Sequence, residues 1–282
     1  PSLITRNRSG QNLEKVHEGE QNMDDVLKEI KDSWDQLSDS AWYRSLRTDG
    51  KIAELMEDPA SAFHPGIYAM LNSCFPDWKG KRVLLPSSGD NHAAFAFARM
   101  GAEVTSTDIS ERQLEYAREI ADRLELPIRF ACEDTMELSG LGDEAYDLVY
   151  TSNGTHTWIM DVKRMYQNIS RVLRPGGFSV MYDIHPFNRL FTGEPWKGPQ
   201  IQKPYGEIMP HCHWRVQDLV NAMAEAGLSI REMEELQAVN ASFWFSYDEL
   251  QRQDAAKLEG INDWTQNPMA ALPAWIAITA QK

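Results

Sequence analysis

The chain has 282 residues, of which 42% are hydrophobic and 10% aromatic, enough to bury the core of one large domain with elaborations. It carries 28 Lys and Arg against 42 Asp and Glu, so its net charge is -14 at pH 7. A surface this acidic repels phosphate backbones and anionic lipids, and the sequence has no basic cluster with interleaved aromatic residues. Composition therefore argues against nucleic acid or a membrane surface as the partner.

The three cysteines, Cys74, Cys132 and Cys212, are odd in number, widely separated and without a C-x-x-C pair. This spacing predicts neither a disulfide framework nor a zinc site, and the His211-Cys212-His213 run has no further ligand nearby. No apolar run is long enough to span a membrane, and the N-terminus lacks the apolar core of a signal peptide. We expect a cytoplasmic protein without a bound metal.

The first part of the chain predicts a tail and a group of helices. Residues 1–20 are polar and rich in turn-forming residues. Apolar spacing over residues 22–75 predicts two or three helices, with Asp24 capping one and Pro65 opening another. We treat residues 1–75 as a tail followed by a helical lid.

From Lys81 onward, short apolar runs alternate with amphipathic segments, which is typical of an α/β fold with a mainly parallel sheet. The expected strands lie near residues 82–86, 102–107, 128–132, 146–151, 177–183, 229–236 and 273–280. The expected helices lie near residues 91–100, 110–124, 161–173 and 215–226. Gly227 suits a left-handed cap at the end of the last helix.

The first strand and helix of this part predict a nucleotide site. A tight loop around Gly89 joins them, and Asp108 ends the next strand about 20 residues later, where a carboxylate accepts both hydrogens of a ribose diol. Ser87 and Asn91 replace glycines that let a pyrophosphate approach the backbone. Asp90 adds a negative charge beside the helix N-terminus. A cationic nucleoside therefore fits better than a dinucleotide.

Five landmarks in this order resemble the class I S-adenosylmethionine-dependent methyltransferases over roughly residues 80–182. They are the loop from Leu85 to Asn91, the acid Asp108, and the segments 130–135, 146–154 and 173–177. The resemblance implies a Rossmann-like, seven-stranded, mainly parallel sheet with helices on both faces and an antiparallel last strand. It places a methyltransferase domain at residues 76–282, with substrate-cap excursions at about 184–214 and 237–270.

The resemblance implies S-adenosylmethionine as cofactor, with S-adenosylhomocysteine as the product. The cofactor would contact Ser87, Ser88, Gly89, Asp90, Asn91, Asp108, Ile109, Glu133, Asp134, Thr135, Ser152, Asn153 and Gly154. Asp108 would bind the ribose, Asp134 the adenine amino group, and Asp90 the ammonium of the methionine portion. Asp108 could instead cap the next helix, a role that Ser110 could also fill, and Asp134 could be a plain loop acid.

Two histidines and several aromatic residues are candidates for the acceptor site. His156 and His185 follow the fourth and fifth strands, where either could act as a general base near neutral pH. Outside the strands, aromatic side chains favour a lid that suits a cation or a flat apolar acceptor, or else a separate hydrophobic cluster. The candidate substrate-binding residues are Trp42, Tyr43, Trp158, His211 and Trp214.

Together these features predict an enzyme that methylates a nitrogen or oxygen of a small-molecule acceptor. The alternatives are a methyltransferase-like protein that binds a nucleoside without transfer, and a nicotinamide-dependent oxidoreductase, which the missing loop glycines disfavour. The sequence indicates no oligomeric state.

Overall fold

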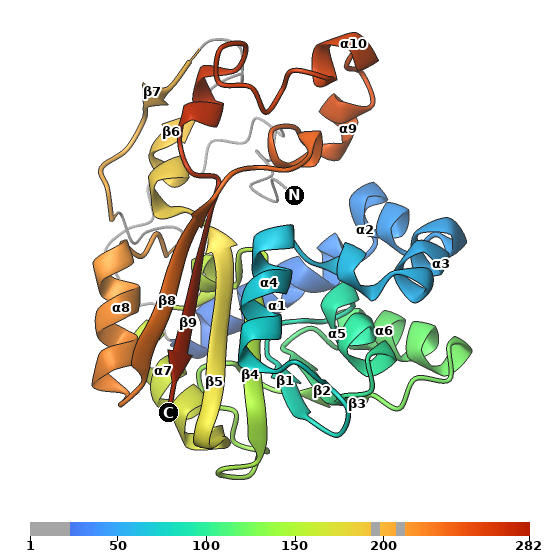
Figure 1. The fold of residues 1–282 in the computed structure, drawn as a ribbon, viewed down its shortest axis with the longest axis vertical. Helices are drawn as coiled ribbons and strands as arrows, with labels where there is room; N and C mark the ends of the chain where they lie inside the picture. Colours follow the sequence, from blue (N-terminus) through green and yellow to red (C-terminus); the bar gives the residue numbers. More distant parts are fainter. Residues whose placement is uncertain (1–22, 193–197, 207–211) are drawn as a thin grey trace.

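The computed structural model describes residues 23–192, 198–206 and 212–282 and has a seven-stranded sheet at its centre (Figure 1). The strand order is β3-β2-β1-β4-β5-β9-β8, in which β1 to β5 run parallel and β9 is antiparallel to both of its neighbours. The strands are β1 (Arg82–Leu85), β2 (Glu103–Asp108), β3 (Arg129–Cys132), β4 (Tyr146–Ser152), β5 (Leu173–Ile184), β8 (Ser229–Leu236) and β9 (Trp275–Gln281). The predicted fold class is confirmed.

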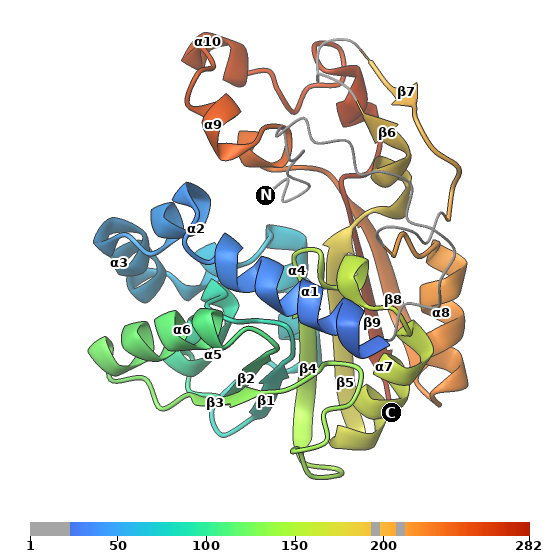
Figure 2. The same cartoon turned by 180° about the vertical axis from the view of Figure 1, so that it is seen from behind.

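Helices cover both faces of the sheet, so its central strands are largely buried. All seven residues of β4 are buried. On one face pack α4 (Pro65–Cys74), α5 (His92–Arg99) and α6 (Glu111–Arg123). On the other pack α7 (Val162–Val172) and α8 (Val216–Glu225), as Figure 2 shows.

The N-terminal segment contains more helices than the two or three that we predicted. Before α4 come α1 (Met23–Leu37), α2 (Ala41–Leu46), α3 (Asp49–Glu57) and a 3-10 turn at Pro59–Ala62. Two polar breaks divide the apolar pattern: the Ser40 hydroxyl accepts the amide of Tyr43 to cap α2, and Asp58 caps the 3-10 turn. Pro65 opens α4, as predicted. Residues 1–20 lie outside the described residues.

The expected lid divides into two parts. Ile52, Leu55, Ile67 and Leu71 belong to the same hydrophobic cluster as Val83 of β1, so α3 and α4 are part of the domain core. By contrast, α1 and α2 lie at the carboxyl ends of the parallel strands (Figures 1 and 2). The boundary at residue 75 stays a prediction, since the packing continues across it.

The chain between the late strands also lies at the carboxyl ends of the parallel strands (Figure 1). It carries η5 (Ala241–Phe243), α9 (Tyr247–Leu250), α10 (Ala255–Leu258) and η6 (Pro268–Ala271). A ring contact between Trp42 of α2 and Tyr247 of α9, with centroids 6.2 Å apart, joins it to the N-terminal helices. After β5 come η3 (Pro186–Leu190) and the short strands β6 (Phe191–Thr192) and β7 (Gln200–Ile201). Within the described ranges, no helix is long and apolar enough to cross a membrane.

Candidate functional site

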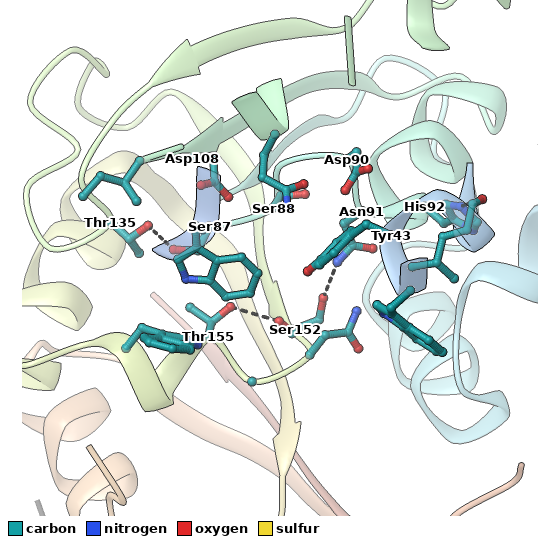
Figure 3. A pocket seen from close by; sticks show the side chains of 18 of the residues that line it. Tyr43, Ser87, Ser88, Asp90, Asn91, His92, Asp108, Thr135, Ser152 and Thr155 are labelled. Atoms are coloured by element: carbon teal, nitrogen blue, oxygen red, sulfur yellow. Dashed lines mark hydrogen bonds between the residues drawn. The ribbon is translucent and has the colours of Figure 1, made fainter. Parts of the chain in front are cut away.

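A cavity of about 390 Å³ opens where the parallel strands end, the usual ligand position in sheets of this kind (Figure 3). The structure brings most of the predicted cofactor residues together in its wall. These are Ser87, Ser88, Asp90, Asn91, Asp108, Ile109, Asp134, Thr135, Ser152, Asn153 and Gly154. Gly89 and Glu133 do not line it.

The loop after β1 keeps its single glycine where a glycine is needed. Gly89 has φ 49°, and a Cβ there would lie 2.8 Å from Cβ of Gln113, so a larger residue would be both strained and crowded. Ser87 is also left-handed, with φ 49°, and its hydroxyl lies 2.6 Å from that of Thr135. Ser87 and Asn91, which stand in place of glycines, thus leave a folded loop. Their side chains reach residues at or just after the ends of other strands of the sheet.

Asn91 is the cap of α5. Its Oδ1 accepts the amide of Ala93 at 2.9 Å, and its Nδ2 donates to the Ser152 hydroxyl at 2.9 Å. The asparagine therefore fixes the helix N-terminus to the end of β4, across the cavity floor (Figure 3).

Asp108 is buried at the end of β2, where its Oδ1 accepts the amide of Ser110 at 2.8 Å. The pKa of Asp108 is raised to about 7, chiefly by burial and also by the nearby charges of Asp90 and Asp35, against the hydrogen bond from Ser110. Ser110 caps α6, because its hydroxyl accepts the amide of Gln113 at 3.1 Å. The capping role considered for Asp108 thus belongs to Ser110, and Asp108 faces the cavity.

Asp90 is paired with a cation of the protein. Nε of Arg47, which follows α2, donates to Oδ2 of Asp90, and one guanidinium nitrogen of Arg47 donates to the Ser38 carbonyl at 2.7 Å. The guanidinium carbon lies 3.8 Å from the ring centroid of Tyr116. Burial raises the pKa of Asp90, which Arg47 partly offsets. This buried ion pair connects the N-terminal helices to the loop after β1.

The acids after β3 differ in position. Asp134 lines the cavity and accepts the amide of Met136 at 2.9 Å, and burial raises its pKa. Glu133 lies outside the cavity wall, beside Gly140. Of the two predicted candidates, only Asp134 is placed to meet a ligand.

A strained turn follows β4. Asn153 and Gly154 have φ values of 62° and 95°, and the Asn153 amide donates to the Tyr182 carbonyl at 3.0 Å. Such backbone is uncommon outside glycine and is held by its surroundings. It turns the chain so that both residues line the cavity.

Aromatic rings from three elements cover the cavity. Trp42 and Tyr43 of α2 and Trp158 after β4 line it, as expected for substrate-binding candidates. Trp34 of α1 lies between the last two, with ring centroids 6.3 Å from Tyr43 and 5.5 Å from Trp158. Trp214 is not in the wall and instead donates to the Ile159 carbonyl at 2.9 Å. His211 lies outside the described residues.

The two histidines predicted as bases do not line the cavity. Nδ1 of His156 donates to Asp183 at 2.8 Å, and its Nε2 accepts from the Tyr166 hydroxyl at 2.8 Å. Burial alone would raise the pKa of Asp183, but the hydrogen bond from His156 and the charge of Arg189 hold it below its usual value. The sequence placed His156 at the correct strand end, but its ring turns inward.

Both ring nitrogens of His185 also have hydrogen-bond partners. Its Nε2 donates to Glu235 at 2.9 Å and its Nδ1 accepts the amide of Phe187 at 3.2 Å. Burial lowers the pKa of His185, although the Glu235 carboxylate opposes this. The geometry gives both histidines structural partners, which differs from the expected catalytic role.

Other wall residues were not assigned from the sequence. They are Leu27, Ile30, Trp34, Leu46, Lys51, Ser61, Ala62, His92, Gln113, Met136, Thr155, Ile159, Asn240 and Ser242. For His92 the signal was its place next to the loop after β1, whereas Asn240 and Ser242 come from the 237–270 excursion that we expected to cap the site. Across the described ranges no group of three or more His, Cys, Asp or Glu side chains could hold a metal ion.

Comparison with known proteins identifies the domain. Residues 84–181 match the family model of a methyltransferase domain. An uncharacterized methyltransferase of Bacillus subtilis is 32% identical over 120 residues, which cover 43% of this chain and 47% of that protein. The ubiquinone biosynthesis O-methyltransferase of Coxiella burnetii is 31% identical over 99 residues, covering 35% and 42%. The chain thus matches less than half the length of these relatives.

Solved structures share the fold. An S-adenosylmethionine-dependent methyltransferase from Mesorhizobium loti has a TM-score of 0.56 and 21% identity, over 76% of this chain and 97% of its own. The [4+2]-cyclase SpnF has a TM-score of 0.53 and 22% identity, over 77% and 80%. At these identities the likeness concerns the fold, which supports more than one kind of reaction.

Proposed function

Because the chain belongs to the class I S-adenosylmethionine-dependent methyltransferases, we propose that its cavity binds S-adenosylmethionine and that the protein methylates a small molecule. The observation that carries the proposal is Asp108, a buried carboxylate at the end of β2 in the wall of a cavity of about 390 Å³. A buried acid whose pKa is raised toward neutrality gains stability from hydrogen-bond donors, and a ribose diol supplies two.

The remaining wall fits the rest of this cofactor. Ser88 has a buried hydroxyl without a partner among the described residues, next to the left-handed Ser87. Asp134 and Thr135 would bind the adenine edge, while Ile109 and Trp34 offer apolar surface for the base.

The Asp90–Arg47 pair would hold the methionine portion. Asp90 lines the cavity and attracts an ammonium, while Arg47 limits the cost of burying its charge. Asn153 and Gly154 would bound the space near the reacting group.

The bound cofactor supplies a methyl group on a positively charged sulfur. The protein must then orient an acceptor and exclude water. The rings of Trp34, Trp42, Tyr43 and Trp158 serve the second purpose, and Asn240 and Ser242 add polar groups for an acceptor. Similarity to an enzyme named for O-methylation is compatible with transfer to oxygen, and transfer to nitrogen is the alternative.

Calorimetric titration with S-adenosylhomocysteine, together with transfer of label from methyl-tritiated S-adenosylmethionine to a panel of phenols and amines, tests this proposal. We expect Asp108→Ala to weaken the binding of S-adenosylhomocysteine by about 2 to 4 kcal/mol, or roughly 30- to 1000-fold in the dissociation constant. Glu133→Ala, which removes an acid outside the wall, is the matched control. Binding without transfer to any acceptor would favour the nucleoside-binding alternative, and binding of NADH alone would favour an oxidoreductase.

A further inference from the structure

The histidines of this protein differ in how their ring nitrogens are used. His64, His156 and His185 each have partners on both nitrogens; for His64 these are the Gln237 carbonyl at 3.0 Å and the Gly66 amide at 3.1 Å. A histidine with both nitrogens occupied has no lone pair to accept a proton from a ligand.

His92 has a fixed tautomer with one open nitrogen. Its Nε2 lies 3.0 Å from the Leu46 carbonyl, which only accepts hydrogen bonds, so Nε2 carries the hydrogen and Nδ1 keeps its lone pair. Among the described residues no group hydrogen-bonds to Nδ1. His92 lines the cavity as the first residue of α5, directly after the cap Asn91 (Figure 3).

The surroundings of His92 keep its ring neutral. Burial lowers its pKa; the bond to Leu46 and the charges of Asp90 and Glu54 oppose this, and Lys51 adds to it. These groups come from α2, α3 and the loop after β1, the elements packed around the ring. A neutral imidazole beside a cavity is a proton acceptor at physiological pH.

The neighbouring wall indicates the kind of acceptor. Trp42 and Tyr43 offer ring faces for a flat apolar molecule. The ammonium of Lys51 disfavours a cationic amine and favours a hydroxyl that becomes negative as it reacts, although its ion pair with Glu54 at 2.8 Å reduces this effect. The combination points to a phenol-like hydroxyl.

We propose that His92 is the general base of the transfer and that the acceptor is a phenol-like hydroxyl compound, an inference that rests on the proposed function. The acceptor oxygen forms a bond to the methyl carbon, and the carbon–sulfur bond breaks with both electrons staying on sulfur. The hydroxyl proton passes to Nδ1 of His92, which then releases it to water.

His92 could also act only structurally, by hydrogen-bonding the Leu46 carbonyl to the start of α5. Two substitutions separate this structural role from the role of general base. In His92→Gln the amide nitrogen reaches the Nε2 position, so the bond to Leu46 is kept and the base is lost. In His92→Asn the amide reaches only the Nδ1 position, so the bond is lost as well. His64→Asn, which keeps the capping contact of a histidine outside the cavity, is the control.

The experiment compares these variants with the wild type in S-adenosylhomocysteine affinity, melting temperature, and transfer of tritiated methyl to catechol, 4-hydroxybenzoate and 4-nitrophenol. We expect His92→Gln to keep affinity and melting temperature but lose about 100-fold or more in kcat, together with the acid limb of its pH profile. His64→Asn should keep the wild-type kcat and pH profile.

Separate outcomes concern separate claims. Wild-type activity and pH profile in His92→Gln would overturn the role of His92, and transfer to amines but to no phenol would overturn the acceptor class. Wild type that binds S-adenosylhomocysteine but resists carbethoxylation of His92 by diethyl pyrocarbonate would also overturn the inference, since Nδ1 would then not be open. If the wild type did not bind S-adenosylhomocysteine, the proposed function itself would be refuted.

Discussion

The raised pKa of Asp108 makes cofactor affinity depend on pH. In the free protein burial places this pKa at about 7, whereas hydroxyl donors from a ribose stabilise the charged form. Binding therefore favours the ionised carboxylate and releases a proton below this pKa. With a pKa of about 7, roughly one-tenth of the free protein is ionised at about pH 6 and roughly nine-tenths at about pH 8.

The affinity for S-adenosylhomocysteine should consequently rise about tenfold over this range, or about 1.4 kcal/mol. Calorimetry in buffers of different ionisation enthalpy gives both the dissociation constant and the number of protons released. Release should approach one proton near pH 6 and vanish near pH 8. Asp134→Ala should keep this slope and Asp108→Asn should lose it, because the amide does not titrate.

The same group affects the protein without ligand. Its folded pKa lies above the unfolded value of 3.8, so the folded state binds more protons between about pH 4 and 7. The stability that Asp108 contributes is thus fully present below about pH 4 and is lost as the pH rises through 7. A pH-independent affinity in the wild type, or the wild-type slope in Asp108→Asn, would refute the reasoning.

Three further substitutions test the site's framework. Arg47→Ala should lower the free energy of unfolding by about 3 to 5 kcal/mol in denaturant titrations, because it leaves Asp90 buried without its cation; loss of less than about 1 kcal/mol would contradict this. Gly89→Ala should cost about 1 to 3 kcal/mol and weaken cofactor binding, whereas Gly142→Ala, with open space around its Cβ, should change neither. Asp134→Ala should weaken adenosine-containing ligands without lowering the melting temperature, and equal affinity with reduced thermal stability would make Asp134 a structural acid.

The sheet could be predicted because its physical signal is local. Buried parallel strands such as β1 and β4 are short, mostly apolar runs between polar turns, because both faces of each strand pack against other parts of the protein. The same locality explains the error in the N-terminal segment. The breaks at Ser40 and Asp58 interrupt short helices that remain apolar on one side, so the pattern continues across them.

The histidines show where sequence reasoning stops. The order of strands identifies which loops meet at one edge of the sheet, and this placed Asp108 and Asn153 correctly beside the cavity. It does not tell which way a side chain turns within a loop. His156 turns toward Asp183 and Tyr166, because the carboxylate of Asp183 is buried near the end of β5 and needs a hydrogen-bond donor there.

His92 could not be identified as a candidate base from its own loop, because that requires the contacts of a helix distant in the sequence. Its open nitrogen follows from the carbonyl of Leu46, which is 46 residues away and reaches the ring only because α2 lies against the start of α5. The Arg47–Asp90 pair adds a second contact nearby, between the residue that follows α2 and the loop that precedes α5. The helices before the sheet therefore do more than cover the cavity. They set the charge of the loop after β1 and the tautomer of the residue that we propose as the base, and neither property is contained in residues 84–181 alone.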